Sequence, residues 1–228
     1  MNTMSDTGTQ VSIPTVGTVR GAVPPVLTHP TTDAHLRALG AAMVAFRAHG
    51  ARLARWGTHV TEVLAVQGGR LLTAGNGGSA AQAQHLAAEL VGKLRQDRRP
   101  MSALALHAET SSLTAIANDY GYERVYAREV QAHGRPGDIL LLMSTSGASA
   151  NLRAAAGVGR ALGLTVWGLT GPLPNPLAAC CDDVLAVESD DNQTIQELHL
   201  VAIHLLCEHV DAALPGVMAG AWQSRREP

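Results

Sequence analysis

The strongest constraint on the fold is a repeated alternation between short apolar runs and longer stretches with helical periodicity. The apolar runs lie at residues 70–75, 103–107, 138–144, 165–171 and 183–188, and the helix-like stretches lie at 79–95, 110–118, 124–133, 149–162 and 192–213. Runs this short and this apolar are typical of strands that are buried on both faces. The alternation therefore predicts an α/β protein in which helices cover both sides of a parallel sheet.

The region before the first strand has a helical period throughout. Residues 32–65 are expected to be helical with breaks at the glycines, and Thr32 and Asp33 are the candidate N-caps. Residues 1–31 mix Ser, Thr, Gly and Pro and are expected to form a flexible tail. Residues 32–228 are then a single domain that includes the N-terminal helix. The apolar stripe of that helix consists of Leu36, Leu39, Met43 and Phe46.

Charge and cysteine content argue against several classes of function. A formal net charge of −2 disfavours nucleic-acid binding that depends on counterion release. We find no signal-peptide pattern and expect no apolar run long enough to cross a membrane. The three cysteines include the adjacent pair Cys180 and Cys181, which could not form a disulfide without strain. The cysteines therefore predict a reducing, cytoplasmic environment.

A glycine-rich turn, residues 75–79 (GNGGS), joins the first predicted strand to a helix. Glycines let a backbone approach a ligand closely, and the N-terminus of the helix offers free N–H groups that can bind phosphate. The glycine spacing matches neither the dinucleotide-binding pattern nor the Walker A loop. The turn is therefore either part of a phosphate or sugar site or simply a tight connection between strand and helix.

A hydroxyl-rich turn, residues 144–149 (STSGAS), follows the third predicted strand. Its four hydroxyl groups exceed the one that a helix cap requires, and several donors together suit a phosphate monoester. A plain Ser/Thr loop is the alternative. Because ligands of doubly wound folds bind at the carboxyl ends of the strands, the two turns together favour a sugar-phosphate site.

Histidine and glutamate side chains provide the candidate reactive groups. His85 and Glu89 are four residues apart and hence on one helical face, a pairing that suits metal binding, acid–base catalysis or an ordinary surface contact. The apolar helix at 194–210 carries Gln196, His199 and His204 as polar interruptions. Gln196 and His204 are about 12 Å apart along a helix axis. Spacing alone therefore does not establish a site, and a lone histidine on such a helix is more often a core residue.

Four segments together resemble a known family. GNGGSAAQAQHLAAELVGK, LTAIANDYGYERVYAREV, GRPGDILLLMSTSGASAN and TIQELHLVAIHLLCE are similar to the sugar isomerase (SIS) domain, and more narrowly to the phosphoheptose isomerases, over residues 33–213. The resemblance implies a doubly wound three-layer sandwich with a flavodoxin-like, five-stranded parallel sheet. It also implies an enzyme that isomerises D-sedoheptulose 7-phosphate to D-glycero-D-manno-heptose 7-phosphate for heptose biosynthesis by enediol proton transfer.

The resemblance also implies roles for individual residues. Glu89 and His204 match the proton-transfer residues, and one zinc ion per subunit is expected at His85, Glu89, Gln196 and His204. The family forms cytoplasmic homotetramers with active sites shared between subunits, and we expect a sugar-phosphate substrate and no nucleic-acid or membrane partner. The positions that match substrate or phosphate contacts are Asn76, Gly77, Ser79, Asp119, Ser144, Thr145, Ser146, Ser149 and Gln196.

The sequence departs from the family pattern at three places, none of them catalytic. Thr194 stands where relatives commonly carry Arg, Lys93 replaces an Arg, and residues 171–183 lack a usual Gly-Gly. These departures bear on substrate detail.

Other functions of SIS proteins remain as alternatives. One is a non-catalytic SIS protein that binds the replication initiator DnaA, but such proteins lack residues corresponding to Glu89 and His204, which this chain has. A transcriptional sensor would carry a DNA-binding domain beside the SIS domain, and a glucosamine-6-phosphate synthase-type isomerase would need two SIS copies.

Overall fold

The computed structural model describes residues 29–224 and contains one five-stranded, all-parallel sheet. The strand order β2-β1-β3-β4-β5 is the flavodoxin-like order, which confirms the predicted α/β class. The strands are β1 (Leu71–Gly75), β2 (Ala103–Ala105), β3 (Ile139–Ser144), β4 (Thr165–Thr170) and β5 (Asp183–Ala186). Each lies within one of the predicted apolar runs.

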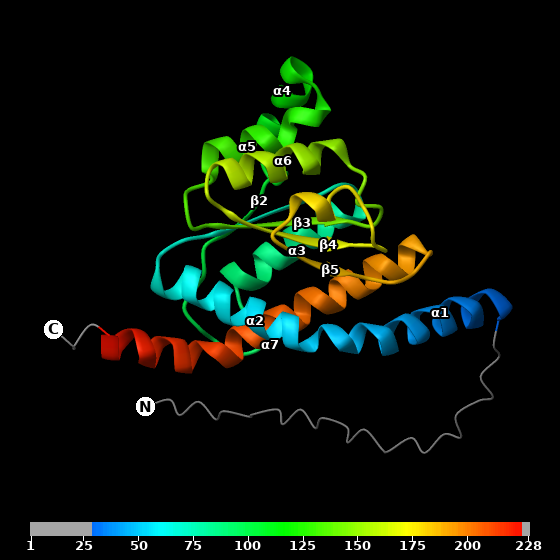
Figure 1. Ribbon diagram of the computed structural model, residues 1–228, viewed down its shortest axis with the longest axis horizontal. Helices are drawn as coiled ribbons and strands as arrows, with labels where there is room; N and C mark the ends of the chain where they lie inside the picture. Colours follow the sequence, from blue (N-terminus) through cyan, green and yellow to red (C-terminus); the bar gives the residue numbers. More distant parts are fainter. Residues whose placement is uncertain (1–28, 225–228) are drawn as a thin grey trace, which may run out of the picture.

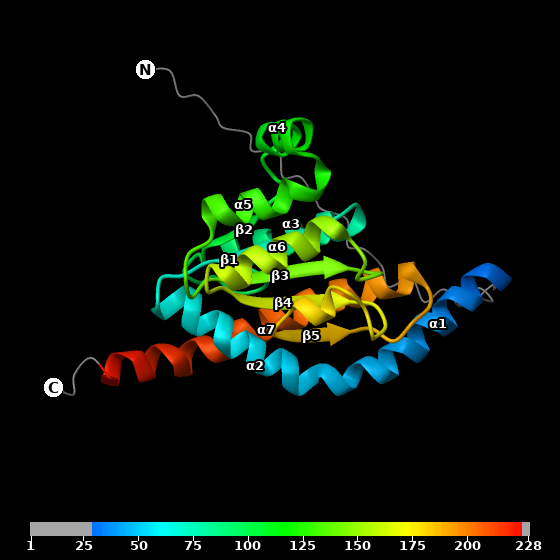
Figure 2. The same cartoon turned by 45° about the horizontal axis from the view of Figure 1, so that its top comes forward.

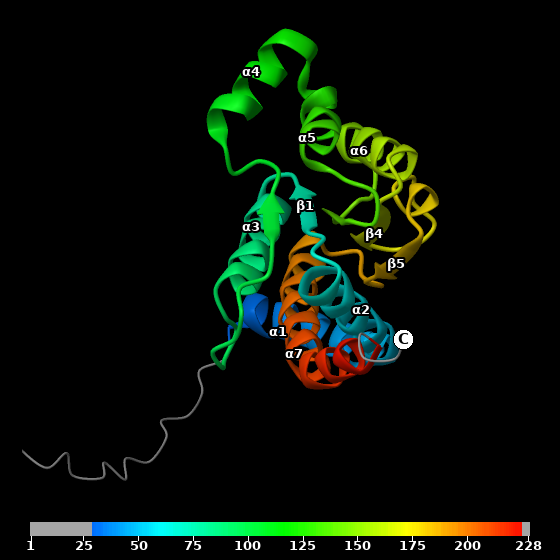
Figure 3. The same ribbon diagram turned by 90° about the vertical axis from the view of Figure 1, so that its left-hand side faces the viewer.

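Helices cover both faces of the sheet, so the domain has three layers (Figure 1, Figure 2). The layer that bears the site consists of α2 (Gly50–Thr61), α3 (Gly78–Val91) and α7 (Asn192–Ser224). The opposite layer consists of α5 (Val125–His133) and α6 (Ala150–Ala161). A further helix, α4 (Thr110–Tyr120), has no buried residue and stands away from the sheet (Figure 3).

The buried strand β3 shows how the sequence supports two apolar cores. Ile139, Leu141 and Met143 pack with the α2, α3 and α7 side, whereas Leu140 and Leu142 pack with the α5 and α6 side. Successive side chains of a strand point to opposite faces, so a strand covered on both sides is apolar at nearly every position. Burying each leucine contributes roughly 2 kcal/mol.

The N-terminal helix begins earlier than predicted. Helix α1 spans Pro30–Phe46, with His29 at the N-cap position, so Thr32 and Asp33 lie inside the helix and are not its caps. Proline is favoured at the first helical position because its missing N–H would have no partner there. The helix continues through the 3₁₀ turn Arg47–His49 into α2, while Gly40 causes no break. The predicted flexible tail spans residues 1–31, but its residues 30 and 31 belong to α1, whereas residues 1–28 lie outside the described residues.

Helix α7 is longer than the predicted 192–213 and continues through Pro215 to Ser224. Its Asn192–Gln223 portion is long and apolar enough to cross a membrane by length and composition, contrary to our expectation for the sequence. A core helix of a soluble protein meets the same criteria. The apolar residues Leu198, Ile203 and Leu206 of this helix are buried in the core with residues of the sheet and α2.

Candidate active site

The glycine-rich turn lies at the carboxyl end of β1, as predicted, and leads directly into α3. Gly77 is the N-cap of α3 and has a φ of 54°, a conformation that side chains with a Cβ rarely adopt. The backbone N–H of Ser79 donates to the carbonyl of Asn76 at 3.0 Å, and the Ser79 side chain is buried. From the opposite layer, the buried Tyr126 hydroxyl donates to the Gly75 carbonyl. The turn is therefore fixed by a hydrogen bond within its own backbone and by a second one from α5.

The hydroxyl-rich turn lies at the carboxyl end of β3, next to β1 in the sheet. Gly147 has a φ of 61°, and a Cβ on it would meet the Asn175 side chain at 2.1 Å. The Ser144 hydroxyl accepts from the Gly147 N–H at 3.1 Å, and Ser149, at the N-cap of α6, makes no side-chain cap bond. The Ser146 hydroxyl accepts from the Ala148 N–H, and Thr145 is partly exposed.

Asn151 and Tyr122, which sequence reasoning missed, hold the side chain of the predicted site residue Asn76. The side-chain amides of Asn76 and Asn151 exchange hydrogen bonds of 3.0 and 2.9 Å, and the Tyr122 hydroxyl donates to the side-chain Oδ1 atom of Asn76 at 3.0 Å. Asn151 is almost fully buried in the first turn of α6. The Asn76 side chain is therefore held in place by the first turn of α6 and by Tyr122. The one available signal was the position of Asn151, two residues after the end of the STSGAS turn.

The reactive side chains meet between α3 and α7. The Nε2 atoms of His85 and His204 lie 3.1 Å apart, and the Nε2 atom of His85 lies 3.3 Å from the Oε1 atom of Glu89. The candidate ligand atoms of these three residues all lie within 4.8 Å of one another, and we refer to the three as the His/Glu/His cluster. The second carboxylate oxygen of Glu89, Oε2, is buried and has no hydrogen-bond partner among the described residues. A partly buried carboxylate beside two imidazoles can bind a metal ion or transfer protons.

Gln196 is a residue of α7 whose side chain lies against the start of α3 and not beside the two histidines. Its amide is so close to Gly78 that a Cβ on that glycine would meet the Gln196 Oε1 atom at 2.6 Å. The Gln196 carbonyl accepts from the Gln82 amide at 2.6 Å. Gln196 therefore faces the glycine-rich turn, whereas His204, two turns further along α7, faces His85.

Two other polar residues of α7 serve the structure. His199 is completely buried with its Nε2 atom 3.2 Å from the Thr170 carbonyl, and burial lowers the pKa of the imidazole to about 4. His199 is thus the core histidine that the helix pattern suggests. Thr194 is also buried, and its hydroxyl donates at 2.7 Å to Asp191, the residue directly before α7.

Asp119 is the predicted site residue that lies apart from this cluster. It is exposed on α4 and accepts a hydrogen bond from the Asn118 amide at 2.8 Å. Helix α4 stands away from the sheet and from α3 (Figure 3).

The fold and the two turns define an SIS domain protein, and the model of the SIS domain family matches residues 37–171. A phosphoheptose isomerase from Streptomyces coelicolor is 60% identical over 186 residues, which are 82% of this chain and 80% of that protein. The structure of a phosphoheptose isomerase from Neisseria gonorrhoeae matches with a TM-score of 0.73 at 35% identity, over 80% of this chain and 97% of that one. The corresponding Francisella tularensis structure also has a TM-score of 0.73, at 30% identity and the same coverage.

The chain belongs to the phosphoheptose isomerase family of SIS domain proteins, a family of ketose–aldose isomerases. The comparisons give no support to the DnaA-binding alternative.

Proposed function

We propose that this protein interconverts D-sedoheptulose 7-phosphate and D-glycero-D-manno-heptose 7-phosphate for heptose biosynthesis. The observation that carries the proposal is the His/Glu/His cluster, in which His85 and Glu89 lie on the helix that follows the glycine-rich turn and His204 faces them from α7. His85 follows Gly78 by seven residues, or about 10 Å along α3. A phosphate bound at the hydroxyl-rich turn and a reacting carbon near Glu89 would then lie at opposite ends of an extended seven-carbon sugar. The high identity to named phosphoheptose isomerases supports the same substrate.

The His/Glu/His cluster fits a zinc ion. Two nitrogens and one carboxylate oxygen are a common ligand set for catalytic zinc, and two nitrogens bound to one tetrahedral zinc ion lie roughly 3.3 Å apart. The Nε2 atoms of His85 and His204 are 3.1 Å apart. We propose one zinc ion per subunit, with Gln196 as a fourth ligand once its amide turns from Gly78 toward His204. A bound zinc ion would polarise the substrate carbonyl.

Glu89 would move the proton that is bonded to carbon. It would take a proton from C1 of the ketose and return it to C2, which converts the C2 ketone into an alcohol and leaves an aldehyde at C1. The two carboxylate oxygens have different surroundings, since Oε1 faces His85 whereas Oε2 has no hydrogen-bond partner. This asymmetry supports Oε2 as the oxygen that acts as the base, while Oε1 remains beside His85.

His204 would move the protons on oxygen. It would protonate the C2 oxygen as the enediol forms and accept the proton from the C1 oxygen as the aldehyde forms, so the overall reaction neither consumes nor releases protons. Its imidazole is partly exposed, within reach of a substrate beside α3.

The remaining predicted site residues would bind the substrate. Ser144, Thr145, Ser146 and Ser149 would hold the phosphate with the N–H groups at the start of α6. Gly77, Ser79 and the amide of Asn76 would line the sugar, and Gln196 would contact it before binding metal.

A homotetramer with shared active sites would give Asp119 a place in the site. Asp119 lies on α4, which stands apart from the cluster of its own chain, so we propose that it reaches the substrate of a neighbouring subunit. The exposed apolar side chains of α1 support such an assembly, since Leu36 and Val44 are 58% and 70% exposed. The unpaired cysteines 180, 181 and 207 support a cytoplasmic location.

The test is a direct assay. Purified protein is incubated with sedoheptulose 7-phosphate, with chelator and then with added zinc, and the aldose is followed by NMR. We expect conversion that chelator abolishes and zinc restores. The absence of conversion under every metal condition, together with capture of purified DnaA, would favour the non-catalytic alternative.

A further inference from the structure

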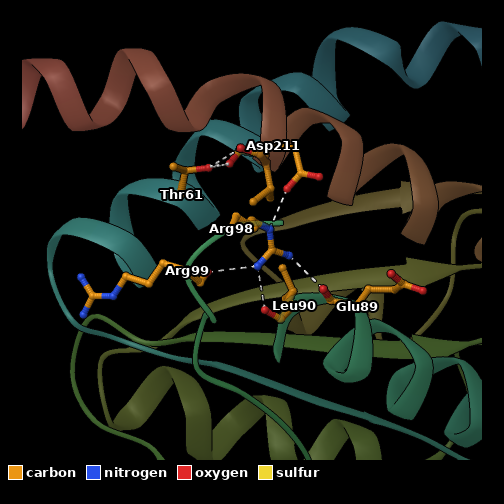
Figure 4. Close-up of polar contacts among 8 residues, drawn as sticks. Thr61, Glu89, Leu90, Arg98, Arg99 and Asp211 are labelled. Atoms are coloured by element: carbon orange, nitrogen blue, oxygen red, sulfur yellow. Dashed lines mark hydrogen bonds and ion pairs between the residues drawn. The ribbon is translucent and has the colours of Figure 1, made fainter. Parts of the chain in front are cut away.

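Arg98 carries a buried charge in a part of the chain without regular structure. It lies between α3 and β2, and only 5% of its side chain is exposed. Its Nε atom donates to the Oδ1 atom of Asp211 at 2.7 Å (Figure 4). Its Nη2 atom donates to the Glu89 carbonyl at 2.8 Å, and its Nη1 atom donates to the carbonyls of Leu90 and Arg99 at 2.9 and 3.3 Å. All three nitrogens are engaged, so the planar guanidinium has one fixed orientation.

The carbonyls of Glu89 and Leu90 belong to the last turn of α3. Carbonyls in the last turn of a helix lack intrahelical partners, and a positive charge there is favourable because it complements the helix dipole. Arg98 therefore caps the helix that carries His85 and Glu89. The Glu89 carboxylate points away from the guanidinium (Figure 4), so Arg98 holds the backbone of Glu89 and leaves its carboxylate available.

Asp211 joins this cap to the helix that carries His204. Asp211 and His204 are seven residues apart on α7, so their side chains leave the helix in directions that differ by only about 20°. At the same level, the buried Thr61 hydroxyl of α2 donates to the Val210 carbonyl at 3.2 Å, which fixes this part of α7 against α2. The Arg98–Asp211 ion pair thus connects the C-terminal end of α3 to an anchored segment of α7.

We propose that Arg98 is a positioning residue for the reaction. Together with Asp211, it fixes the separation and rotation of α3 relative to α7, and so brings His85 and Glu89 to His204. The inference rests on the function proposed above for the His/Glu/His cluster.

A second ion pair in the same region provides a matched control. Arg95 lies three residues before Arg98 and pairs with Glu208 of α7, three residues before Asp211, at 2.5 Å. The Arg95 and Glu208 side chains are 74% and 41% exposed, and exposed pairs contribute little to stability. Arg95 donates to none of the α3 carbonyls that Arg98 caps. Arg95 therefore has the same charge as Arg98 and also pairs with α7, but it does not cap the C-terminal end of α3.

The experiment compares Arg98→Met and Asp211→Asn with Arg95→Met and Glu208→Gln in the full chain. Cobalt(II) is titrated as the metal probe and followed by its visible absorption, while kcat and KM for sedoheptulose 7-phosphate are measured separately. We expect Arg98→Met and Asp211→Asn to lose about 10–100-fold in cobalt affinity and in kcat. KM should change little, because the hydroxyl-rich turn that would bind the phosphate follows β3 and is not part of the α3–α7 connection. Both control variants should match the wild type.

Chemical rescue separates positioning from general loss of structure. Arg98→Ala leaves a space for a small guanidinium compound, so methylguanidine at non-denaturing concentration should restore part of its cobalt affinity and kcat, with no effect on Arg95→Met. If Arg98→Met does not fold, Asp211→Asn and the rescued Arg98→Ala carry the comparison.

Wild-type cobalt affinity and kcat in Arg98→Met would overturn the proposal. Equal losses in Arg95→Met would overturn it as well, because they would assign the effect to charge alone. A wild-type protein that binds cobalt without isomerising the sugar would contradict only the proposed function, since the cobalt comparison still decides the role of Arg98. A wild-type protein that binds no cobalt would contradict both.

Discussion

The imidazoles of His85 and His204 come from residues 119 positions apart in the sequence, yet their Nε2 atoms lie 3.1 Å apart. The rings are tilted by 60° with centroids 5.2 Å apart, so the nitrogens approach each other edge to edge without stacking. This arrangement leaves both nitrogens facing the Glu89 side of the cluster, where a metal ion or the oxygens of a sugar could be bound. The contact joins α3 to α7, and the proposed chemistry depends on it.

Replacing His204 with glutamine should remove proton transfer while leaving the fold intact. Glutamine retains hydrogen-bonding atoms but cannot act as a base, so we expect kcat to fall by about 10²–10⁴-fold. The measurement is the NMR assay, with size-exclusion chromatography as a check of folding and assembly. His133→Gln, which changes a histidine of the opposite helical layer, should retain wild-type kcat. Substantial activity in His204→Gln would remove this residue from the mechanism.

Replacing Asn151 with alanine should loosen the link between the two turns. Asn76 would lose both amide hydrogen bonds to its partner, and we expect KM for the sugar phosphate to rise roughly tenfold. Tyr122→Phe removes only the hydroxyl that donates to Asn76 and should cause a smaller rise. Steady-state kinetics of both variants, with Tyr120→Phe as the control, would measure this. An unchanged KM in Asn151→Ala would show that the Asn76 side chain needs no support.

Replacing Gly57 with alanine should push α2 away from α7. A Cβ at this position would lie 2.5 Å from the Cβ of His209 and 2.8 Å from its carbonyl carbon, and the backbone atom cannot move as a side-chain end can. We expect a loss of about 1–3 kcal/mol in the free energy of unfolding, measured by urea denaturation. Gly40→Ala is the matched control, because nothing lies within 4 Å of its added Cβ and alanine is the better helix former. Equal stability of the two variants would contradict the close approach of α2 and α7.

The buried His199 should make stability depend on pH below neutrality. Burial lowers the pKa of its imidazole from 6.5 to about 4, so the unfolded chain binds a proton at higher pH than the folded chain does. This contribution to stability is therefore complete above pH 6.5 and is lost as the pH falls toward 4, with a total of about 3 kcal/mol.

Thermal unfolding from pH 7 to pH 4 would measure this dependence. The wild type should lose more stability over that range than His199→Gln, whose side chain does not titrate. Parallel pH profiles for the two proteins would rule out the assignment.

Much of the fold follows from local sequence. The apolar runs predict all five strands to within a few residues, because nearly every position of a doubly covered parallel strand is apolar. The glycine-rich and hydroxyl-rich turns can be recognised from their own glycine, serine and threonine residues. His85 and Glu89 share a helical face by spacing alone. Features that depend on residues near in sequence were therefore predictable.

Features that join distant segments were not predictable. Arg98 lies in the charged stretch RQDRRP, which has the composition of a solvated loop, and its burial depends on a partner 113 residues away. The pairing of Asn76 with Asn151 spans 75 residues. The spacing of Gln196 and His204 left their relation open. The structure shows that each faces a different part of α3, a relation that becomes visible only once α3 and α7 lie side by side.

Isomerisation in D₂O tests whether Glu89 carries the carbon-bound proton. Wild-type protein and Glu89→Gln are incubated with sedoheptulose 7-phosphate in D₂O, and the aldose is examined by NMR for deuterium at C2. We predict that the wild type forms the aldose with deuterium at C2, because a carboxyl group that holds the proton can exchange it with solvent. Glu89→Gln should form no aldose while its fold and assembly persist. Aldose formation by Glu89→Gln at a near-wild-type rate would contradict the role of Glu89 as the residue that moves the carbon-bound proton.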